Sequence, residues 1–193
     1  MTQYGFYYDA DNCIGCHTCQ VACKDVNRLK VGENYRNVRT YVGGEGWDPF
    51  LYHVSMACNQ CNEPACVDVC PTGACAKRDE DGLVLIDKDL CNGCGACAVA
   101  CPYDAIAMID ECGYADKCDG CIALREQGEE PACVASCPQR VLEFGDIEQL
   151  AAKHAGEQLV CEIAAIPAAT TKPNLLINPK PCMFDEDFEP YNI

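Results

Sequence analysis

Basic side chains are scarce in this sequence, and long apolar runs are absent from it. Fourteen lysines and arginines stand against 30 aspartates and glutamates, so the formal net charge is −16. This excess of negative charge argues against nucleic acid or an anionic membrane surface as a direct partner. The longest nearly apolar stretch, residues 161–169, is interrupted by Glu162 and Pro167 and is too short to cross a bilayer. We therefore expect no direct insertion into a membrane.

Recognisable targeting features are also missing from the first residues. Met1 to Gly5 contain no basic region and no apolar core, and no Arg-Arg pair occurs there. This pattern predicts neither a secretory nor a twin-arginine signal. We accordingly expect synthesis in the reducing cytoplasm, where a disulfide framework is not expected.

Motifs for catalysis are lacking as well. The sequence shows no arrangement of nucleophile and base, no acid–base pair and no phosphate-binding loop, so we expect no enzyme activity from the chain on its own. Cysteine, in contrast, is abundant: 20 of 193 residues are cysteines, far above ordinary usage. Such a density requires a chemical role, and metal centres are the first candidate in a reducing compartment.

Sixteen of the cysteines form four groups of four with regular spacing. The first and third groups have the spacing C-x2-C-x2-C-x3-C, the second has C-x2-C-x4-C-x3-C, and the fourth has a longer loop between its second and third members. Proline directly follows the last three groups. In chain order the groups are Cys13, Cys16, Cys19 and Cys23; Cys58, Cys61, Cys66 and Cys70; Cys91, Cys94, Cys97 and Cys101; and Cys118, Cys121, Cys133 and Cys137.

This spacing suits cubane iron–sulfur clusters. Three thiolates on a tight loop can each reach a different iron of one cube, and backbone N–H groups of the loop offset the negative charge. Gly15, Gly93 and Gly120 lie between the first two ligands, where a missing side chain lets the backbone approach closely. The fourth cysteine lies about 6 Å further along a helix, so it is expected to bind a neighbouring cube. The pattern predicts four [4Fe–4S] clusters linked in pairs.

Zinc is the alternative for any single group, because C-x2-C pairs are common in zinc sites. A run of three cysteines followed by a fourth at x3 suits zinc poorly, and the same kind of run occurs here four times. A zinc protein would be colourless, whereas an iron–sulfur protein is brown.

The sequence also repeats itself. The stretch from Asp9 to Cys23 recurs at 87–101 with nine of fifteen positions identical, and Glu63 to Pro71 recurs at 130–138 with seven of nine identical. We interpret the chain, residues 1–193, as a single ferredoxin-type protein built from a duplicated two-motif unit. The repeats are residues 4–27 with 56–86, and residues 87–145. Residues 28–55 form an insertion and residues 146–193 a C-terminal extension.

Local patterns predict an α+β fold with short strands and helices around the clusters. We expect strands at 4–8 and 141–144, a hairpin joining 74–77 to 83–86, and a helix from Asp146 to about residue 155 with Gln149 at the capping-box position. The insertion reads as a β-ribbon turning around residues 43–46, and the extension reads as extended chain. We expect both to wrap around the cluster domain or to contact a partner.

Some residues beside the cysteine groups have less specific roles. Cys75, Cys112, Cys161 and Cys182 are left over, and we expect them to be small buried apolar residues. Basic residues flank the groups, and we expect some of them to compensate cluster charge and so raise reduction potentials. These residues are Lys24, Lys77, Arg78, Lys117, Arg125 and Arg140.

Four stretches outside the groups, together with the groups themselves, carry a family resemblance. They are Thr2-Gln-Tyr-Gly-Phe6, Lys117-Cys-Asp-Gly-Cys121, Leu142-Glu-Phe-Gly145 and Thr171-Lys-Pro-Asn174. The sequence resembles the iron–sulfur subunits (B subunits) of dimethyl sulfoxide reductases, within the four-cluster electron-transfer subunits of molybdopterin oxidoreductases. The resemblance implies two interlocked units of bacterial-ferredoxin type.

The resemblance also implies which cysteines share a cluster. Set I would be Cys13, Cys16, Cys19 and Cys137; set II Cys118, Cys121, Cys133 and Cys23; set III Cys58, Cys61, Cys66 and Cys101; and set IV Cys91, Cys94, Cys97 and Cys70. Because Cys94 is present, four-iron clusters are expected throughout. The duplication by itself leaves another pairing open, in which the first group shares its clusters with the second.

The implied partners are a catalytic subunit holding a molybdopterin cofactor and a membrane subunit that oxidises quinol. The chain would then be membrane-associated through its partners, and any export would be co-transport with a signal-bearing catalytic partner. Two alternatives remain open from the sequence. The chain is the small subunit of a soluble molybdopterin enzyme, such as a transhydroxylase or dehydroxylase, or it is a free polyferredoxin.

Overall fold

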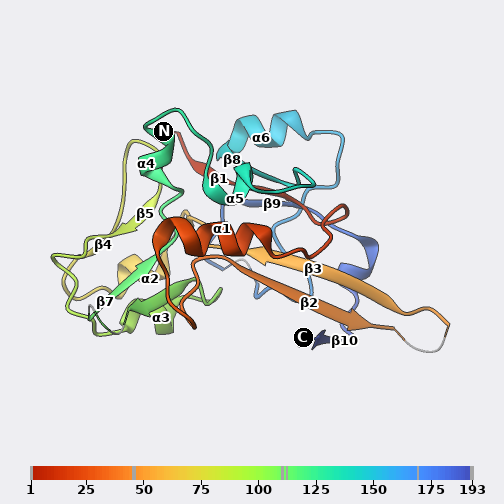
Figure 1. The fold of residues 1–193 in the computed structure, drawn as a ribbon, viewed down its shortest axis with the longest axis horizontal. Helices are drawn as coiled ribbons and strands as arrows, with labels where there is room; N and C mark the ends of the chain where they lie inside the picture. The colour runs from red at the N-terminus through yellow and green to blue at the C-terminus, as the bar shows by residue number, and fades with distance from the viewer. Residues whose placement is uncertain (1, 45–46, 110, 112, 169, 192–193) are drawn as a thin grey trace.

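The computed structural model describes residues 2–44, 47–109, 111, 113–168 and 170–191. The fold is α+β, as expected, with short elements joined by long loops (Figure 1). The strands are β1 (Tyr4–Asp9), β2 (Asn37–Gly43), β3 (Phe50–Met56), β4 (Cys75–Lys77), β5 (Val84–Ile86), β6 (Ile106–Ile109), β7 (Tyr114–Lys117), β8 (Leu142–Asp146), β9 (Leu175–Asn178) and β10 (Phe188–Tyr191). The helices are α1 (Thr18–Asn27), α2 (Ala65–Asp68), α3 (Ala96–Ala100), α4 (Ile122–Arg125), α5 (Ala132–Ala135), α6 (Ile147–Lys153) and the 3-10 helix η1 (Pro181–Phe184).

Two three-stranded sheets hold the ends of the chain to its middle. In the first, β1 lies between β8, which is antiparallel to it, and β9, which is parallel. In the second, β2 lies between β3 and β10, and both neighbours are antiparallel to it. The C-terminal extension therefore contributes one strand to each sheet. This is how an extended segment without a core of its own becomes part of the domain.

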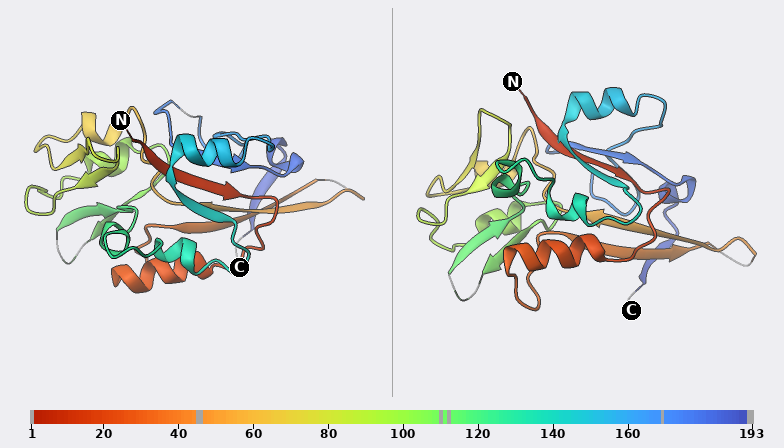
Figure 2. Two further views of the ribbon diagram at one scale, coloured as in Figure 1. Left: turned by 90° about the horizontal axis from the view of Figure 1, so that it is seen from above. Right: turned by 45° about the horizontal axis from the view of Figure 1, so that its top comes forward.

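The insertion folds as the expected β-ribbon. Strands β2 and β3 form a long hairpin that extends away from the rest of the molecule (Figures 1 and 2). Of the predicted turn at residues 43–46, Glu45 and Gly46 lie outside the described residues. Near its base the hairpin packs against the body: the Tyr8 hydroxyl of β1 donates to the backbone oxygen of His53 in β3, at 2.7 Å.

Two further hairpins lie at the opposite end of the molecule from the ribbon tip (Figure 2). Strands β4 and β5 form the predicted hairpin, with Cys75 opposite Ile86. Strands β6 and β7 form a second one that the sequence patterns did not indicate. Each hairpin joins two consecutive cysteine groups, so the short strands fix the distance between the loops that carry the cysteines.

The main core lies between the two sheets and consists of aromatic and aliphatic side chains with several of the cysteines among them. Phe6, Tyr8 and Tyr52 are fully buried in it. On the other side of β1, the Tyr7 ring stacks on His154 with ring centroids 3.6 Å apart, and its hydroxyl donates to Glu157 at 2.6 Å. Strand β1 is thus covered on both faces, which explains why four consecutive residues, 5–8, are buried.

Helix α6 begins where the sequence indicates. The Asp146 Oδ1 atom accepts the backbone N–H groups of Glu148 and Gln149, each at 3.0 Å. The helix ends at Lys153, two residues before the expected end. The N-cap satisfies donors that have no partner inside the helix.

Replacement of Asp146 by alanine removes this cap. We expect Asp146→Ala to lower the free energy of unfolding by about 1 kcal/mol, and Asp146→Asn, which keeps a capping oxygen, to cost less. Urea unfolding of the iron-loaded protein, followed by far-ultraviolet circular dichroism, measures the difference. Equal stability of Asp146→Ala and wild type would show that the cap contributes nothing.

Candidate metal centres

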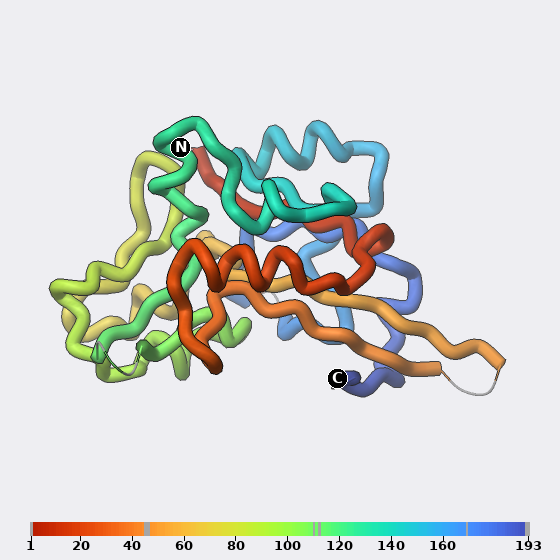
Figure 3. The backbone as a smooth tube through the Cα atoms, viewed as in Figure 1, coloured from red at the N-terminus to blue at the C-terminus, as the bar shows by residue number. Residues whose placement is uncertain are grey.

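Short helices bring the cysteine groups together in two pairs. Helix α1, which carries Cys19 and Cys23, packs against α5, which carries Cys133. Helix α2, with Cys66, packs against α3, with Cys97. The first group therefore meets the fourth, and the second meets the third. Figure 3 shows the same arrangement: the segments around residues 20 and 135 lie side by side, and those around 65 and 97 gather at the other end.

One cavity contains a complete predicted ligand set. Cys13, Cys16, Cys19 and Cys137 all line it, although the last is more than 100 residues from the others. Tyr8, Val38 and Leu142 form part of its wall. Cys19 Sγ lies 3.4 Å from the Ser55 hydroxyl, which provides a hydrogen bond to a thiolate at this position. The geometry thus favours set I over any set that combines the first group with the second.

Cys23 lies beside cysteines of the fourth group. Burial raises the pKa of Cys23 to about 12; the Arg36 guanidinium opposes this rise, and the thiols of Cys133 and Cys121 add to it. Burial likewise raises the pKa of Cys118, with further contributions from Cys23 and Cys133. These neighbours are the members of set II. The position of Cys23 beside the fourth group follows from the helical turn that separates it from Cys19.

The second and third groups also have cysteines that lie close to one another. Burial raises the pKa of Cys61 to about 11; a hydrogen bond from Thr171 lowers it, and the thiols of Cys58 and Cys101 raise it. Burial also raises the pKa of Cys101, to which Cys58 and Cys66 contribute. Cys101 therefore lies with the ligands of set III, one helical turn beyond the third group's own loop.

The cysteines of set IV lie at the end of the molecule that holds β4 to β7. Cys70 Sγ accepts the backbone N–H of Cys75 at 3.4 Å, and Cys91 Sγ accepts that of Ala115 at the same distance. Cys97 lies near both Cys91 and Cys66. The fourth member, Cys94, is exposed at the surface.

The donors are therefore thiols in four neighbourhoods rather than one compact site. In the described residues, no three cysteine, histidine or acidic side chains converge on a point that would hold a single metal ion. A cube of four irons needs its ligands spread around a larger body, and thiolates are the donors that such clusters take. The residues present fit [4Fe–4S] clusters.

Lys117 is the one predicted basic residue, among those that the structure describes, that donates to a cysteine sulfur. It is only 3% exposed, and its Nζ atom lies 3.3 Å from Cys58 Sγ and 3.4 Å from the backbone oxygen of Cys118. It also donates to the Val84 backbone oxygen. The ammonium group thus lies between a ligand of set III and one of set II.

The other flanking basic residues bind elsewhere. Lys24 donates to the backbone oxygens of Lys30 and Glu33, Lys77 to that of Cys61, and Arg140 to that of Ala135. Arg78 and Arg125 both pair with Asp81. These side chains hold loops in place, so charge compensation by direct contact is limited to Lys117 within this group.

The C-terminal extension clamps the loop of the second cysteine group. Thr171 donates its hydroxyl to Cys61 Sγ at 3.2 Å, and its backbone oxygen accepts the N–H of Glu63. Asn174 donates to the backbone oxygen of Gln60 at 2.6 Å. Gln60 is itself fully buried and donates to the backbone oxygen of Cys118 at 2.9 Å. A series of hydrogen bonds thus runs from the extension through the second group to the fourth.

Of the leftover cysteines, Cys75 is buried as expected, and Cys112 lies outside the described residues. Cys161 and Cys182 are only partly buried, which corrects the expectation that they are core residues. Both lie in the C-terminal extension, which runs over the surface of the domain, and this leaves one side of each open.

Three residues that position or neighbour the cysteines escaped the sequence analysis: Arg36, Gln60 and Thr171. Arg36 is 2% exposed and lies beside ligands of sets I and II. One signal was available for it: Arg36, Val38 and Thr40 share the period of two that places alternate residues on one strand face, and all three are buried. Gln60 carries no comparable signal, and Thr171 stands out only as the start of the stretch 171–174 that carries the family resemblance.

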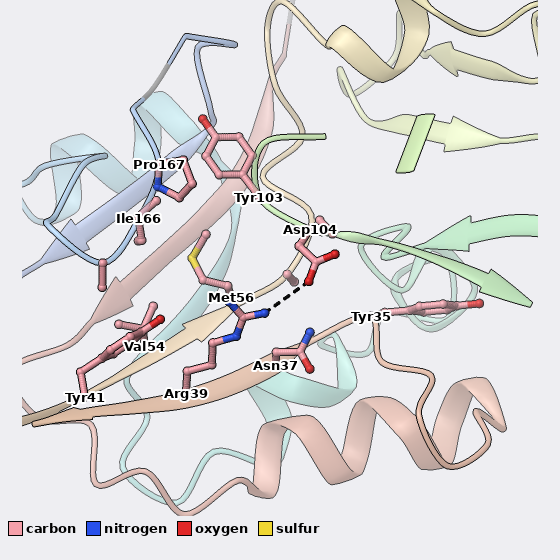
Figure 4. A pocket seen from close by; sticks show the side chains of 13 residues that line it. Tyr35, Asn37, Arg39, Tyr41, Val54, Met56, Tyr103, Asp104, Ile166 and Pro167 are labelled. Carbon is pink, nitrogen blue, oxygen red and sulfur yellow. Dashed lines mark hydrogen bonds and ion pairs between the residues drawn. The ribbon is translucent and has the colours of Figure 1, made fainter. Parts of the chain in front are cut away.

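A pocket beside the ribbon contains no cysteine. It lies between β2, β3 and the loops at residues 103–105 and 165–167, and the side chain of Arg39 reaches across it to Asp104 (Figure 4). The two atoms that form this ion pair are 3.3 Å apart, and both side chains are mostly exposed.

Comparisons with known proteins agree with this chemistry. Residues 49–147 match the family described as a 4Fe-4S dicluster domain, and residues 4–25 match a 4Fe-4S binding domain. The B subunit of anaerobic dimethyl sulfoxide reductase of Escherichia coli is 43% identical over 187 residues, 92% of this protein and 89% of that one. The protein belongs to this B-subunit family. Its members are iron–sulfur electron-transfer subunits of reductase complexes, and the resemblance noted from the sequence is confirmed.

Other relatives are named as chains of dimethyl sulfoxide and polysulfide reductases. The protein named "Probable anaerobic dimethyl sulfoxide reductase chain YnfG" of Escherichia coli is 45% identical, with 92% of this protein and 89% of that one covered. The B subunit of polysulfide reductase of Wolinella succinogenes is 38% identical over 92% of this protein and 94% of its own length. In the described part of this chain, no helix is long and apolar enough to span a membrane.

Two glycines in the third cysteine loop provide a test of how tightly the loop is built. Gly93 and Gly95 both have positive φ, at 69° and 73°. A methyl group on Gly93 would overlap the backbone oxygen of Gly113, whereas one on Gly95 would meet nothing closer than Met108 Sδ at 3.9 Å. Both alanine variants carry the left-handed strain of about 1–2 kcal/mol, but only Gly93→Ala adds a clash with backbone.

We therefore expect Gly93→Ala to lose iron from the cluster in this loop, and Gly95→Ala to retain far more of it. Iron per chain and visible absorbance after anaerobic purification measure the loss. Equal iron content in the two variants would contradict the steric role of Gly93.

Proposed function

We propose that the chain carries electrons through four [4Fe–4S] clusters, between a quinol-oxidising membrane subunit and a molybdopterin-containing catalytic subunit. Sets I to IV would hold the clusters, each of which accepts and releases one electron at its iron atoms. The observation that carries the proposal is the packing of the cysteine groups in two pairs: the first group lies with the fourth, and the second with the third.

The neighbourhoods are arranged in a row. Cys19 of set I lies near Cys133 of set II. Cys118 of set II lies near Cys58 of set III, with Lys117 between them. Cys66 of set III lies near Cys97 of set IV. Each set therefore borders the next, which supports a relay of closely spaced redox centres from set I to set IV.

The proposed partners come from the family. Its relatives are named as subunits of dimethyl sulfoxide and polysulfide reductases, and a protein with no catalytic arrangement of its own needs a catalytic subunit to use its electrons. We propose that this subunit holds the molybdopterin cofactor. The membrane subunit would anchor the complex, which would place the chain at a membrane through its partners alone.

Anaerobic purification of the chain with its natural partners tests the function. We expect a brown complex that contains molybdenum and a hydrophobic subunit, with about sixteen irons per chain. Molybdenum without a membrane subunit would instead favour a soluble molybdopterin enzyme. Migration of the chain alone would favour a free polyferredoxin, and a colourless zinc-containing product would contradict the proposal altogether.

The ligand sets are tested by replacing the last cysteine of the fourth group. We expect Cys137→Ser to alter or remove the cluster of set I, because Cys137 shares a cavity with the first group, and to leave the cluster of set II in place. Electron paramagnetic resonance of the reduced protein, with iron analysis, reports the loss.

Two matched variants complete this test. Cys23→Ser should affect set II in the same way, and Cys161→Ser, outside all four groups, should keep its full iron content. If Cys137→Ser and Cys23→Ser each perturbed the cluster of their own group, the exchange of ligands would be wrong.

A further inference from the structure

One buried cation lies between the first two cluster sites and has no assigned role. Arg36, at the entry to β2, is 2% exposed. Its guanidinium lies over the Phe6 ring, with Cζ 4.5 Å from the ring centroid. One nitrogen, Nη1, donates to the Ser55 hydroxyl at 3.0 Å and to the Ser55 backbone oxygen at 3.2 Å. The cation is therefore fixed in position by aromatic and polar contacts.

The surroundings of Arg36 are thiols. The charges that act most on it are those of Cys133, Cys19, Cys118 and Cys23, which belong to sets I and II. Burial would lower the pKa of Arg36, but these negative neighbours outweigh burial and raise it. Ser55 connects Arg36 to set I, because the hydroxyl that accepts a hydrogen bond from Arg36 also lies 3.4 Å from Cys19 Sγ. The guanidinium thus carries a permanent positive charge at the junction of the two sets.

Two nitrogens of the guanidinium lack an acceptor. Among the described residues, buried Nε and Nη2 of Arg36 have no hydrogen-bond partner. An unpaired buried donor is rare and costly, and a donor carrying charge costs more. The groups whose charge acts most on Arg36 are the cysteines of sets I and II, so thiolate or cluster sulfur is the acceptor expected for these donors.

We propose that Arg36 sets the reduction potentials of the first two clusters by holding one fixed positive charge between them. This inference rests on the proposed function, since it requires clusters in sets I and II. Adding an electron to either cluster increases its negative charge, and a nearby cation in a medium of low dielectric constant favours that reduced form. Because the charge is shared, it raises both potentials together.

Arg39 provides a matched control on the strand that Arg36 precedes, β2. It lies three residues from Arg36, so its side chain points to the opposite face of the ribbon. There it is 57% exposed and pairs with Asp104 (Figure 4). Water and the carboxylate screen its charge, whereas Arg36 is shielded from water.

The test compares Arg36→Gln, Arg36→Lys and Arg39→Gln with wild type, each purified anaerobically with its natural partners. Redox titration followed by electron paramagnetic resonance gives the potential of each cluster. We expect Arg36→Gln to make two of the four clusters harder to reduce. At a fixed potential the ratio of reduced to oxidised cluster should fall about tenfold, equivalent to about 59 mV for a one-electron couple.

The affected clusters should be the two whose signals change in Cys137→Ser and Cys23→Ser. Arg39→Gln should leave all four potentials unchanged, and Arg36→Lys, which keeps the charge, should stay close to wild type. The proposal is overturned if Arg36→Gln shifts none of the clusters or all four equally, or if Arg36→Lys shifts them as much as Arg36→Gln does.

Loss of iron from Arg36→Gln would not end the test. Full iron content and wild-type potentials in Arg36→Lys would then support the role of the charge, and the same iron loss in Arg36→Lys would overturn it in favour of a packing role. Failure of the proposed function is visible separately: wild type itself would then hold far fewer than about sixteen irons per chain.

Discussion

The repulsion between many thiolates inside a small chain is the constraint on which this structure depends. Sixteen cysteines in four groups lie within a protein whose remaining charge is already strongly negative. Burial raises the pKa of Cys23, Cys61 and Cys118, so the charged ligand form is unfavourable there without compensation. Backbone N–H groups of the ligand loops, hydroxyls such as Thr171 and Ser55, and two buried cations supply that compensation. The fold can be understood as a scaffold that brings these donors to the sulfurs.

The two cations differ in a way that suits their positions. Lys117 is a compact ammonium that donates directly to Cys58 Sγ and to backbone oxygens on either side. Arg36 is a planar group held over the Phe6 ring, with donors directed to more than one side. Lys117 lies between sets II and III, and Arg36 lies between sets I and II. Electrostatic compensation is thus concentrated at the junctions along the row.

Much of the local structure could be predicted because it depends on short-range chemistry. The cysteine spacing, the Asp146 cap and the turn before β5 can each be recognised from a few neighbouring residues. The structure has the cap and the hairpin close to the expected positions. The pairing of the groups came from the family resemblance alone, since the repeat left two pairings open; the packing of α1 on α5 favours one of them.

Other features depend on contacts that no local pattern contains. Arg36 lies in a segment without cysteines. Only its spacing of two residues from Val38, which places both side chains on one face of the strand, indicates that it is buried. The extension reads as extended chain, yet Thr171 and Asn174 reach the loop of the second group across more than 100 residues. The partial exposure of Cys161 and Cys182 likewise follows from the path of the C-terminal extension over the surface of the domain. Composition identified the chemistry of the site, and tertiary contacts decided which residues surround it.

The second and third cysteine groups lie in the sequence between the first and the fourth, and this order has a consequence for assembly during translation. The second and third groups, which lie together, are complete once residue 101 has been synthesised. With the proposed ligand sets, the first group must wait for the fourth, because set I includes Cys137, which lines the same cavity as Cys13. During translation the inner half of the molecule can therefore close while the N-terminal cysteines are still waiting for their partners. The oldest part of the nascent polypeptide is the last to be finished, and until then its thiols remain open to oxidants and to stray metals.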